Sequence, residues 1–289
     1  MPSLTSSGSG WPLGRPTVSS ASSTLPPPPL RPFVNSRGLL VSCSYDRRVI
    51  VWRENSPNSW EKTFVYEAHE LSVNSVCFGP HEHGLLVGCA SSDGSVSLLR
   101  YQELKTHTTT NPAANEGQWN AQRFMAHHMG VNALVFAPSA GEESLPAVGA
   151  AMRFATGGCD NLIKIWRYEV ITGDAVCEEV LKKQTGWVRT LAWTAFPGFN
   201  VGALASGSAD STVCVWRGSD IGKPFQPSVL PAFAEEVWDV SWSHEGATGK
   251  RPTLAVTTGD GLTTFWQVPF TDNTTATGGS RVAWAKIDA

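Results

Sequence analysis

Short runs of alternating apolar and polar residues fill most of the chain, and one such run recurs with a fixed internal spacing. Each copy has a few small residues, then an aspartate, and six residues later a tryptophan or another large apolar residue. A single match to this spacing means little, but five copies predict an array built from one repeated unit. The five repeat aspartates are Asp46, Asp93, Asp160, Asp210 and Asp260.

The intervals between these aspartates, 47, 67, 50 and 50 residues, suit a four-stranded propeller blade with loop insertions. A second pattern, Val-x-x-(Val/Leu)-x-(Phe/Trp), occurs at residues 73–78, 131–136, 188–193 and 237–242. Its β-branched and aromatic residues, with no helical period, indicate a short buried strand. Around Asp160 we therefore predict an inner strand at 131–136, strands at 153–157 and 162–167 joined by a tight turn at 159–161, and an outer strand around 176–181.

An aspartate in the turn and a tryptophan on the next strand are typical of a WD-repeat blade. There the carboxylate accepts from a loop histidine, and the histidine gives its other proton to a Ser or Thr that meets the indole N–H. Other copies lack a member, since Gln184 stands for the histidine, Leu99 for the tryptophan and Val256 for the hydroxyl. This set also resembles a catalytic triad, but its repetition favours a structural tetrad. The complete tetrad is His127, Thr156, Asp160 and Trp166.

Composition agrees with an all-β protein, because 27 of the 289 residues are Gly, 19 are Pro and only 16% are charged. The net charge of -3 and a pI near 6.2 do not suit a polyanion, so we expect no direct nucleic-acid binding. No apolar run reaches the roughly 18 residues of a membrane span, so any membrane association is expected to be peripheral. We predict no cofactor and no metal. The six cysteines contain no CxxC pair, and the only candidate metal cluster lacks ligand-like pairing: Cys77, His81, His83 and Cys89.

Residues 1–37 differ from the rest of the chain, which we interpret as an incomplete propeller at residues 38–289. This first segment is rich in Ser, Pro and Gly and contains no Asp, Glu or Lys. Such a composition buries too little apolar surface to offset the ordering entropy, so we predict disorder. A transit peptide is also Ser-rich and acid-poor, but here no apolar stripe accompanies the three arginines. The blades start at Gly38 with a second strand, and we predict no inner strand before it.

Five stretches share more than spacing with one known family. They are residues 42–53 (SCSYDRRVIVWR), 72–81 (SVNSVCFGPH), 157–166 (GGCDNLIKIW), 187–193 (WVRTLAW) and 237–243 (VWDVSWS). In these stretches the chain resembles the Sec-thirteen family of WD-repeat proteins, and the resemblance covers roughly residues 38–289. It implies a structural subunit and no enzyme: a six-bladed propeller left open, to which a scaffold partner donates a seventh blade.

The resemblance implies three settings for such a subunit. In the COPII outer coat, which serves protein transport from the endoplasmic reticulum to the Golgi, the partner is the large outer-coat subunit. In the nuclear-pore Y-shaped complex, linked to mRNA transport, the partner is a scaffold nucleoporin. The third setting is a vacuolar or lysosomal nutrient-signalling complex. The expected locations are the cytoplasmic face of the endoplasmic reticulum and its vesicles, the nuclear pore, and the vacuolar or lysosomal membrane.

The chain departs from the family at its front. We count four complete four-stranded blades plus one partial blade, so we expect a truncated product or an isoform with a different partner geometry. An unpaired sheet edge is a template for strand addition, and it also predicts that the chain alone aggregates. The last blade is expected to offer part of the surface for the donated blade. Its candidate residues are Val237, Val240, Trp242, Leu254, Val256, Leu262 and Phe265.

Two further interpretations stay open: a generic WD-repeat adaptor, such as a ubiquitin-ligase substrate receptor, and the sister open-propeller nucleoporin. An exposed Arg or aromatic cluster on the channel face favours the adaptor, and an apolar unpaired edge on the last blade favours the coat. A propeller enzyme needs ionisable residues that converge at the channel mouth, where the inner strands offer chiefly Asn74, Asn132 and Arg189. We interpret Arg189 as a turn-facing or interface charge.

Overall fold

The computed structural model of the chain describes residues 19–20, 38–102, 117–138, 152–169, 172–196, 199–218, 222–243, 252–267 and 285–287. Within these ranges the chain forms β-strands and one short 3-10 helix, η1 (His81–His83). No helix among them is long and apolar enough to cross a bilayer. The strands are β1 (Ser19–Ser20), β2 (Leu39–Cys43), β3 (Val49–Ser56), β4 (Ser59–Tyr66), β5 (Val73–Phe78), β6 (Leu86–Ser91), β7 (Ser95–Gln102), β8 (Gln118–Met125), β9 (Val131–Phe136), β10 (Met152–Gly158), β11 (Ile163–Tyr168), β12 (Ala175–Leu181), β13 (Val188–Phe196), β14 (Phe199–Ser208), β15 (Val213–Gly218), β16 (Gln226–Val229), β17 (Val237–Trp242), β18 (Thr253–Thr258), β19 (Thr263–Gln267) and β20 (Ala285–Ile287).

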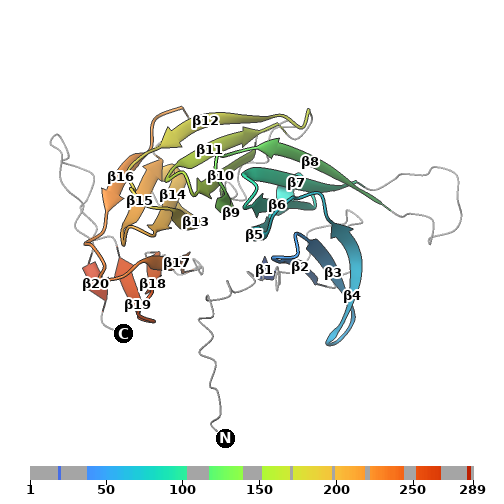
Figure 1. Cartoon of the computed structure of the whole chain (residues 1–289), viewed down its shortest axis with the longest axis horizontal. Coiled ribbons are helices and arrows are strands. Elements are labelled where there is room, and N and C mark those ends of the chain that lie inside the picture. The colour runs from blue at the N-terminus through green and yellow to red at the C-terminus, as the bar shows by residue number, and fades with distance from the viewer. Residues whose placement is uncertain are drawn as a thin grey trace, which may run out of the picture.

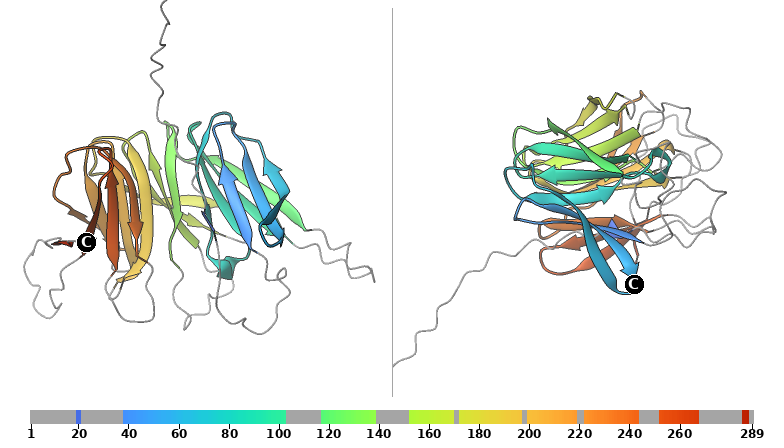
Figure 2. Two further views of the ribbon diagram at one scale, coloured as in Figure 1. Left: turned by 90° about the horizontal axis from the view of Figure 1, so that it is seen from below. Right: turned by 90° about the vertical axis from the view of Figure 1, so that its right-hand side faces the viewer.

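The described strands form five antiparallel four-stranded sheets, which we number first to fifth along the chain: β1–β4, β5–β8, β9–β12, β13–β16 and β17–β20. Figure 1 shows them arranged around an arc, with the first sheet (blue) and the fifth (red) at its two ends. Seen from below in Figure 2, successive sheets stand side by side like blades. This arrangement confirms the predicted open, all-β propeller.

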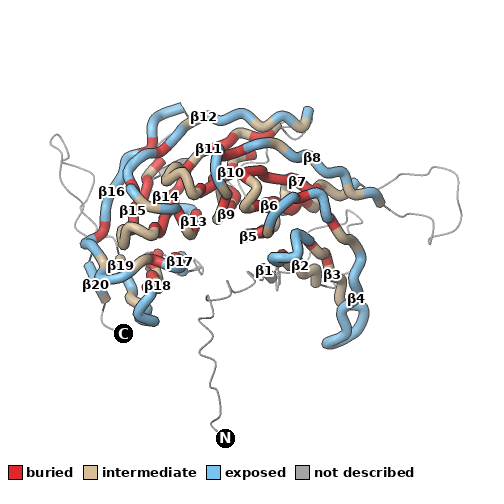
Figure 3. The backbone as a smooth tube through the Cα atoms, viewed as in Figure 1, coloured by how far each residue is buried: buried red, intermediate tan, exposed pale blue. Residues whose placement is uncertain are grey.

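Alternation along the strands creates the four cores that hold neighbouring sheets together. Residues i and i+2 of a strand point to the same side, so each sheet has one face toward the sheet before it and one toward the sheet after it. Between the second and third sheets, for example, Leu98 packs in one cluster with Phe154 and Trp166. Figure 3 shows burial concentrated in the middle strands, while the outer strands β4, β8 and β12 are largely exposed.

The five repeat aspartates sit in equivalent tight turns between the second and third strands of the sheets. In each turn the aspartate carboxylate accepts the backbone N–H two residues later, at 2.8–3.2 Å. The residue between them has a positive φ, which glycine and asparagine tolerate best. These residues are Arg47 (73°), Gly94 (83°), Asn161 (65°), Ser211 (64°) and Gly261 (81°).

The strands predicted around Asp160 agree with the structure to within one or two residues, since β9 to β12 begin and end close to the expected positions. The prediction that no strand precedes Gly38 on the inner side is wrong at two residues. β1 pairs antiparallel with β2, Ser19 with Val41 and Ser20 with Leu40, and so takes the inner position of the first sheet. The rest of residues 1–37, where we predicted disorder, lies outside the described residues, as does most of residues 268–289.

Candidate functional site

The predicted tetrad forms a continuous chain of hydrogen bonds in the third sheet. His127 lies before β9, and its Nδ1 is 2.8 and 2.9 Å from the two carboxylate oxygens of Asp160. Its Nε2 is 2.8 Å from Thr156 Oγ1, which also accepts the indole N–H of Trp166 at 2.9 Å. The other three members of the tetrad, His127, Thr156 and Trp166, are buried. The network ties the loop to β10 and β11, as a structural role requires.

One detail of this network differs from the expectation. Burial lowers the pKa of His127 and outweighs the neighbouring Asp160 carboxylate, so the imidazole is neutral. A neutral ring has one N–H, which belongs on Nδ1 facing the carboxylate. Nε2 must then accept the hydroxyl hydrogen of Thr156 and cannot donate to it. The Thr156 hydroxyl therefore donates to His127 and accepts from the Trp166 indole, so it connects the two side chains in the fixed order of the network.

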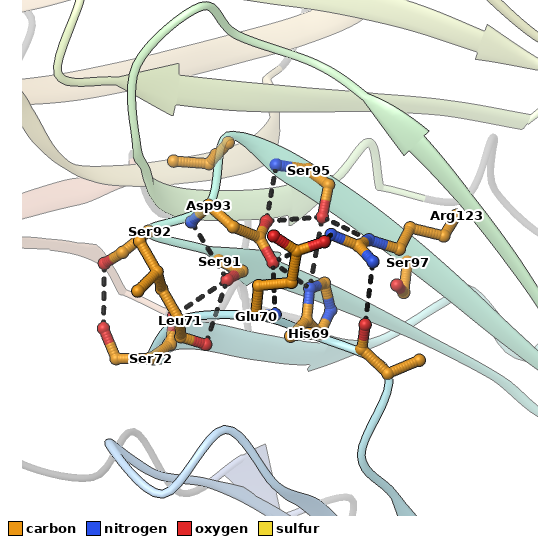
Figure 4. Close-up of polar contacts among 12 residues, drawn as sticks. His69, Glu70, Leu71, Ser72, Ser91, Ser92, Asp93, Ser95, Ser97 and Arg123 are labelled. Carbon is orange, nitrogen blue, oxygen red and sulfur yellow. Dashed lines mark hydrogen bonds and ion pairs between the residues drawn. The ribbon is translucent and has the colours of Figure 1, made fainter.

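The second sheet contains a related network that the sequence analysis missed (Figure 4). His69 Nδ1 is 3.2 Å from Asp93 Oδ2, while His69 Nε2 is buried and has no hydrogen-bond partner among the described residues. The repeat places Cys89 where the third sheet has Thr156, so no hydroxyl of that position meets the ring. The signal was an Ala-His pair, present before both sheets at residues 68–69 and 126–127.

An arginine on the outer strand reinforces this second network. From β8, Arg123 donates to Ser95 Oγ at 2.8 Å, to the Ala68 carbonyl at 2.8 Å and to Asp93 Oδ2 at 3.1 Å. Burial alone would raise the pKa of Asp93, but hydrogen bonds from Ser95 and from the Glu70 backbone outweigh it and hold that pKa well below its usual range. The carboxylate is therefore ionised at neutral pH. The repeat pattern has no arginine position on the outer strand, so the sequence analysis could not predict the role of Arg123.

The other turns show how the sheets that lack a member of the tetrad anchor the turn and the tryptophan. Gln184 donates to the carbonyls of Ser206 and Thr212, both at 3.2 Å, and makes no bond to Asp210. In the fifth sheet, where Val256 replaces the hydroxyl, the Trp266 indole donates instead to Thr264 Oγ1 at 2.9 Å. In these sheets the turn and the tryptophan are anchored separately.

The polar residues at the channel mouth make contacts between neighbouring inner strands. Asn74 Nδ2 donates to the Val131 carbonyl at 2.9 Å, and Asn132 Nδ2 donates to the Val188 carbonyl at 3.0 Å. Arg189 forms an ion pair with Glu236 and lies 4.2 Å from the centre of the Trp238 ring. This places Arg189 as an interface charge between the fourth and fifth sheets.

The candidate metal cluster does not converge among the described residues. In that part of the chain no group of three or more His, Cys, Asp or Glu side chains is arranged to hold a metal ion. Burial raises the pKa of the Cys77 thiol to about 12, and the His81 side chain is turned to solvent. A protonated thiol beside an exposed imidazole is a poor pair of ligands.

In the part of the chain that the structure describes, no sheet lies against one face of the first sheet, at one end of the arc. Six residues before and six after each repeat aspartate, an apolar pair faces the preceding sheet. In the second to fifth sheets all eight of these side chains are at most 8% exposed. In the first sheet the same pair, Leu40 and Trp52, is only half-buried. The eight are Val87 and Leu99, Phe154 and Trp166, Leu204 and Trp216, and Leu254 and Trp266.

The fifth sheet likewise has one face that no other described sheet covers, at the other end of the arc. Five residues after the aspartate, a side chain faces the following sheet, and it is 1% exposed in each of the first four sheets. Those four are Val51, Leu98, Ile165 and Val215. The equivalent Phe265 is 37% exposed. It is the cross-strand neighbour of Ala255 on one side and Ile287 on the other, so these three residues form an apolar row across β18, β19 and β20.

The predicted partner-blade surface on the fifth sheet is therefore corrected in most of its residues. Val237, Val240, Leu254 and Val256 are at most 4% exposed, because they face the fourth sheet and pack in its core. Trp242 packs against the same core and donates its indole N–H to the Ala192 carbonyl at 3.1 Å. Leu262, in the turn, and Phe265 remain exposed. Alternation decides the face: most of the residues that the sequence analysis named lie on the side of the sheet that packs against the fourth sheet.

Comparisons with known proteins agree with this architecture. The family model described as "WD domain, G-beta repeat" matches residues 60–98, 119–167 and 175–217. The chain is 40% identical over 236 residues to "Protein SEC13 homolog" of Drosophila melanogaster, which covers 79% of this chain and 61% of that relative. It is 38% identical over 243 residues to "Protein transport protein sec13" of Emericella nidulans (79% and 72%). With "Protein transport protein SEC13" of Cryptococcus neoformans it shares 32% over 258 residues (79% and 73%).

Proposed function

The chain belongs to the Sec13 family of WD-repeat proteins, and we propose that it is a structural subunit of the COPII vesicle outer coat. Two of the relatives are named protein transport proteins, which supports a role in vesicle-mediated transport. In this proposal the large outer-coat subunit donates a blade to the open propeller. The subunit has no catalytic task and associates with the endoplasmic reticulum membrane peripherally, through the coat.

The observation that carries the proposal is the pair of uncovered faces at the ends of the arc. Each core between neighbouring sheets needs side chains from both, and the side chains of the first and fifth sheets that continue this pattern have no sheet against them among the described residues. Burying an aromatic side chain such as Phe265 contributes about 2 kcal/mol. A donated blade therefore gains the same apolar contacts that hold the five sheets together.

The scaffold nucleoporin of the Y-shaped complex and the nutrient-signalling complex are proposed as further settings. Both would use the same two faces, because a donated blade presents the same kind of surface whichever scaffold follows it.

The proposal is tested by co-purification with blade-donating segments from the outer-coat subunit and from the scaffold nucleoporin. We expect capture of the outer-coat segment, and we expect Phe265→Asp to reduce it at least about tenfold, because a carboxylate in an apolar contact costs more than about 1.4 kcal/mol. Val229→Asp is the matched control, since Val229 is equally exposed, at 41%, but lies on outer strand β16. Failure to bind either segment, while a full-length relative binds both, would exclude the proposal.

One observation favours the adaptor as a second candidate. Trp187 and Trp238 are 48% and 43% exposed on either side of Arg189 at the channel mouth. Exposed Trp and Arg residues are the side chains that most often dominate binding interfaces. Affinity capture with wild-type protein and with Trp238→Ala separates the two candidates. Capture of the coat segment by both proteins supports the coat, whereas a partner other than the coat segment that wild type captures and Trp238→Ala does not supports the adaptor.

A further inference from the structure

The inner edge of the first sheet differs from the inner edges of the other four. The inner strands β5, β9 and β17 have six residues each and β13 has nine, and each pairs with its neighbour along most of its length. β1 has two residues and pairs with β2 at two positions. The strand β2 itself is as well formed as its counterparts and pairs with β3 at five positions, from Leu39 to Cys43. Among the described residues, the first sheet therefore has its shortest strand on the inner side.

The other inner strands show which side chains suit that position. Their residues that face the following sheet are small and polar or nearly so. In β5, Cys77 Sγ donates to the Leu134 carbonyl at 3.5 Å, and in β13, Thr190 Oγ1 donates to Asp239 Oδ1 at 2.9 Å. Both contacts need a short side chain, because adjacent inner strands lie close together around the channel.

The opposite face of an inner strand carries large apolar residues. Leu191 and Trp193 of β13 pack in the core against the third sheet, and Leu134 and Phe136 of β9 pack against the second. In the first sheet these positions would lie on the same side as Leu40 and Trp52, the half-buried pair. Both positions of β1 are serines, so β1 has no large apolar residue to place opposite Leu40.

We propose that the inner edge of β2 is a second acceptor site, at which a strand supplied in trans displaces β1. The strand runs antiparallel to β2 and carries short side chains on the face toward β5 and large apolar side chains on the face toward Leu40 and Trp52. Backbone pairing along β2 supplies affinity, and the alternation of small and large residues supplies specificity. This inference rests on the proposed function in one respect: the supplier is the partner that fills the gap between the first and fifth sheets.

The stability of the pairing between β1 and β2 sets the fraction of molecules in which the acceptor site is covered. A ligand that binds only the form with β1 detached has its apparent affinity reduced by the fraction of molecules in that form. Weakening β1 must therefore tighten binding without any new contact. This requirement distinguishes displacement of β1 from adhesion of a peptide to some other sheet edge.

The test uses the full chain and a fluorescent peptide with the sequence of residues 187–194, which has the inner-strand pattern, measured by anisotropy. The Ser19→Pro/Ser20→Pro variant removes the two N–H groups of β1. We expect it to bind the peptide more tightly than wild type, by at most the reciprocal of the fraction of wild-type molecules in which β1 is detached. Ser22→Pro/Ser23→Pro is the matched control and is expected to bind like wild type. The same peptide with Leu191→Pro and Ala192→Pro is expected not to bind, because it cannot form the ladder.

Hydrogen exchange locates the bound peptide. We expect slower amide exchange in residues 39–43 when the peptide is present. Equal affinity of the wild type and the β1 variant, equal binding of the proline peptide, or protection confined to outer strands such as β4 would each overturn the inference. The coat proposal is separable: an outer-coat segment that binds and protects only β18 and β19 would leave that proposal standing and remove this one. A peptide that protects residues 39–43 while no coat segment binds would do the reverse.

Discussion

The second and third sheets solve the same problem with different residues. Each must hold a tight Asp turn against the loop that leads into its inner strand. The third sheet does so with His127, which is bonded at both ring nitrogens. The second has His69, bonded at one nitrogen only, and adds Arg123 from the outer strand. The difference shows that the repeat specifies the turn, while the side chains that hydrogen-bond to the turn differ from sheet to sheet.

The largest expected effect separates the two histidines. We expect His127→Ala to lower the free energy of unfolding by about 3 kcal/mol, because it leaves both Asp160 and Thr156 without their buried partner. His69→Ala is expected to cost about half as much, since His69 uses only Nδ1, in 3.2 Å contacts with Asp93 and Ser95, and Arg123 still supports Asp93. Urea unfolding followed by tryptophan fluorescence measures both. Equal losses would show that the second network does not depend on Arg123.

A smaller effect is expected for the arginine that marks the second sheet. Arg123→Ala is expected to cost about 1.5 kcal/mol, because it removes three hydrogen bonds, one of them to an ionised carboxylate. Arg48→Ala is the matched control: Arg48 pairs with Glu67 on the surface, where both side chains are more than half exposed, and such pairs contribute about 0–1 kcal/mol. If the two variants lose the same free energy of unfolding, the contacts of Arg123 contribute no more to stability than a surface ion pair does.

A still smaller gain is expected from making the second sheet resemble the third. Cys89→Thr places a hydroxyl at the position of Thr156, where it can donate to the unpartnered Nε2 of His69. We expect a gain of about 0.5–1 kcal/mol, reduced by the missing indole donor, since Leu99 stands at the tryptophan position. The same unfolding measurement tests it. A loss of stability would mean that the site does not admit a hydroxyl.

The smallest expected effect is a change of slope with pH. Burial lowers the pKa of both His69 and His127 below the ordinary value of 6.5. The unfolded chain therefore binds protons that the folded chain does not, and the stabilisation is complete above pH 6.5 and declines as the pH falls below it. His127→Gln is expected to flatten this decline relative to wild type. An unchanged slope in this variant would contradict the assignment of His127 as a neutral ring.

The lowered pKa of Asp93 acts in a separate window. Its folded-state pKa lies below the unfolded value of 3.8, so its stabilisation is present above about pH 4 and declines at lower pH. Between pH 5 and 6.5 the slope comes from the histidines whose pKa burial lowers, His69, His83 and His127. The Asp93 carboxylate raises the pKa of His69, so Asp93→Asn is expected to lower that pKa further and to make the slope steeper.

Prediction from the sequence was successful where a spacing repeats and unsuccessful where a single side chain acts alone. The five turns follow from residue order, because a turn and its flanking strands are local. The complete tetrad followed from the repeat pattern, since His127 lies 33 residues before Asp160, and Arg123 occupies no position of that pattern. Arg123 was missed because its contacts lie 28 and 55 residues away in the chain. The aggregation of the isolated chain stays a prediction, and size-exclusion chromatography tests it.

The sequence by itself determined the family, the number of repeated turns and which strands are apolar. Only the tertiary structure decided which side of the fifth sheet is open: Leu254 is buried, and Phe265, on the other side of the same sheet, is exposed. Both sides of that sheet are apolar, so the alternation along its strands does not identify the side without a neighbour. That choice depends on the sheet that lies against each face, and packing between segments that are distant in sequence decides it.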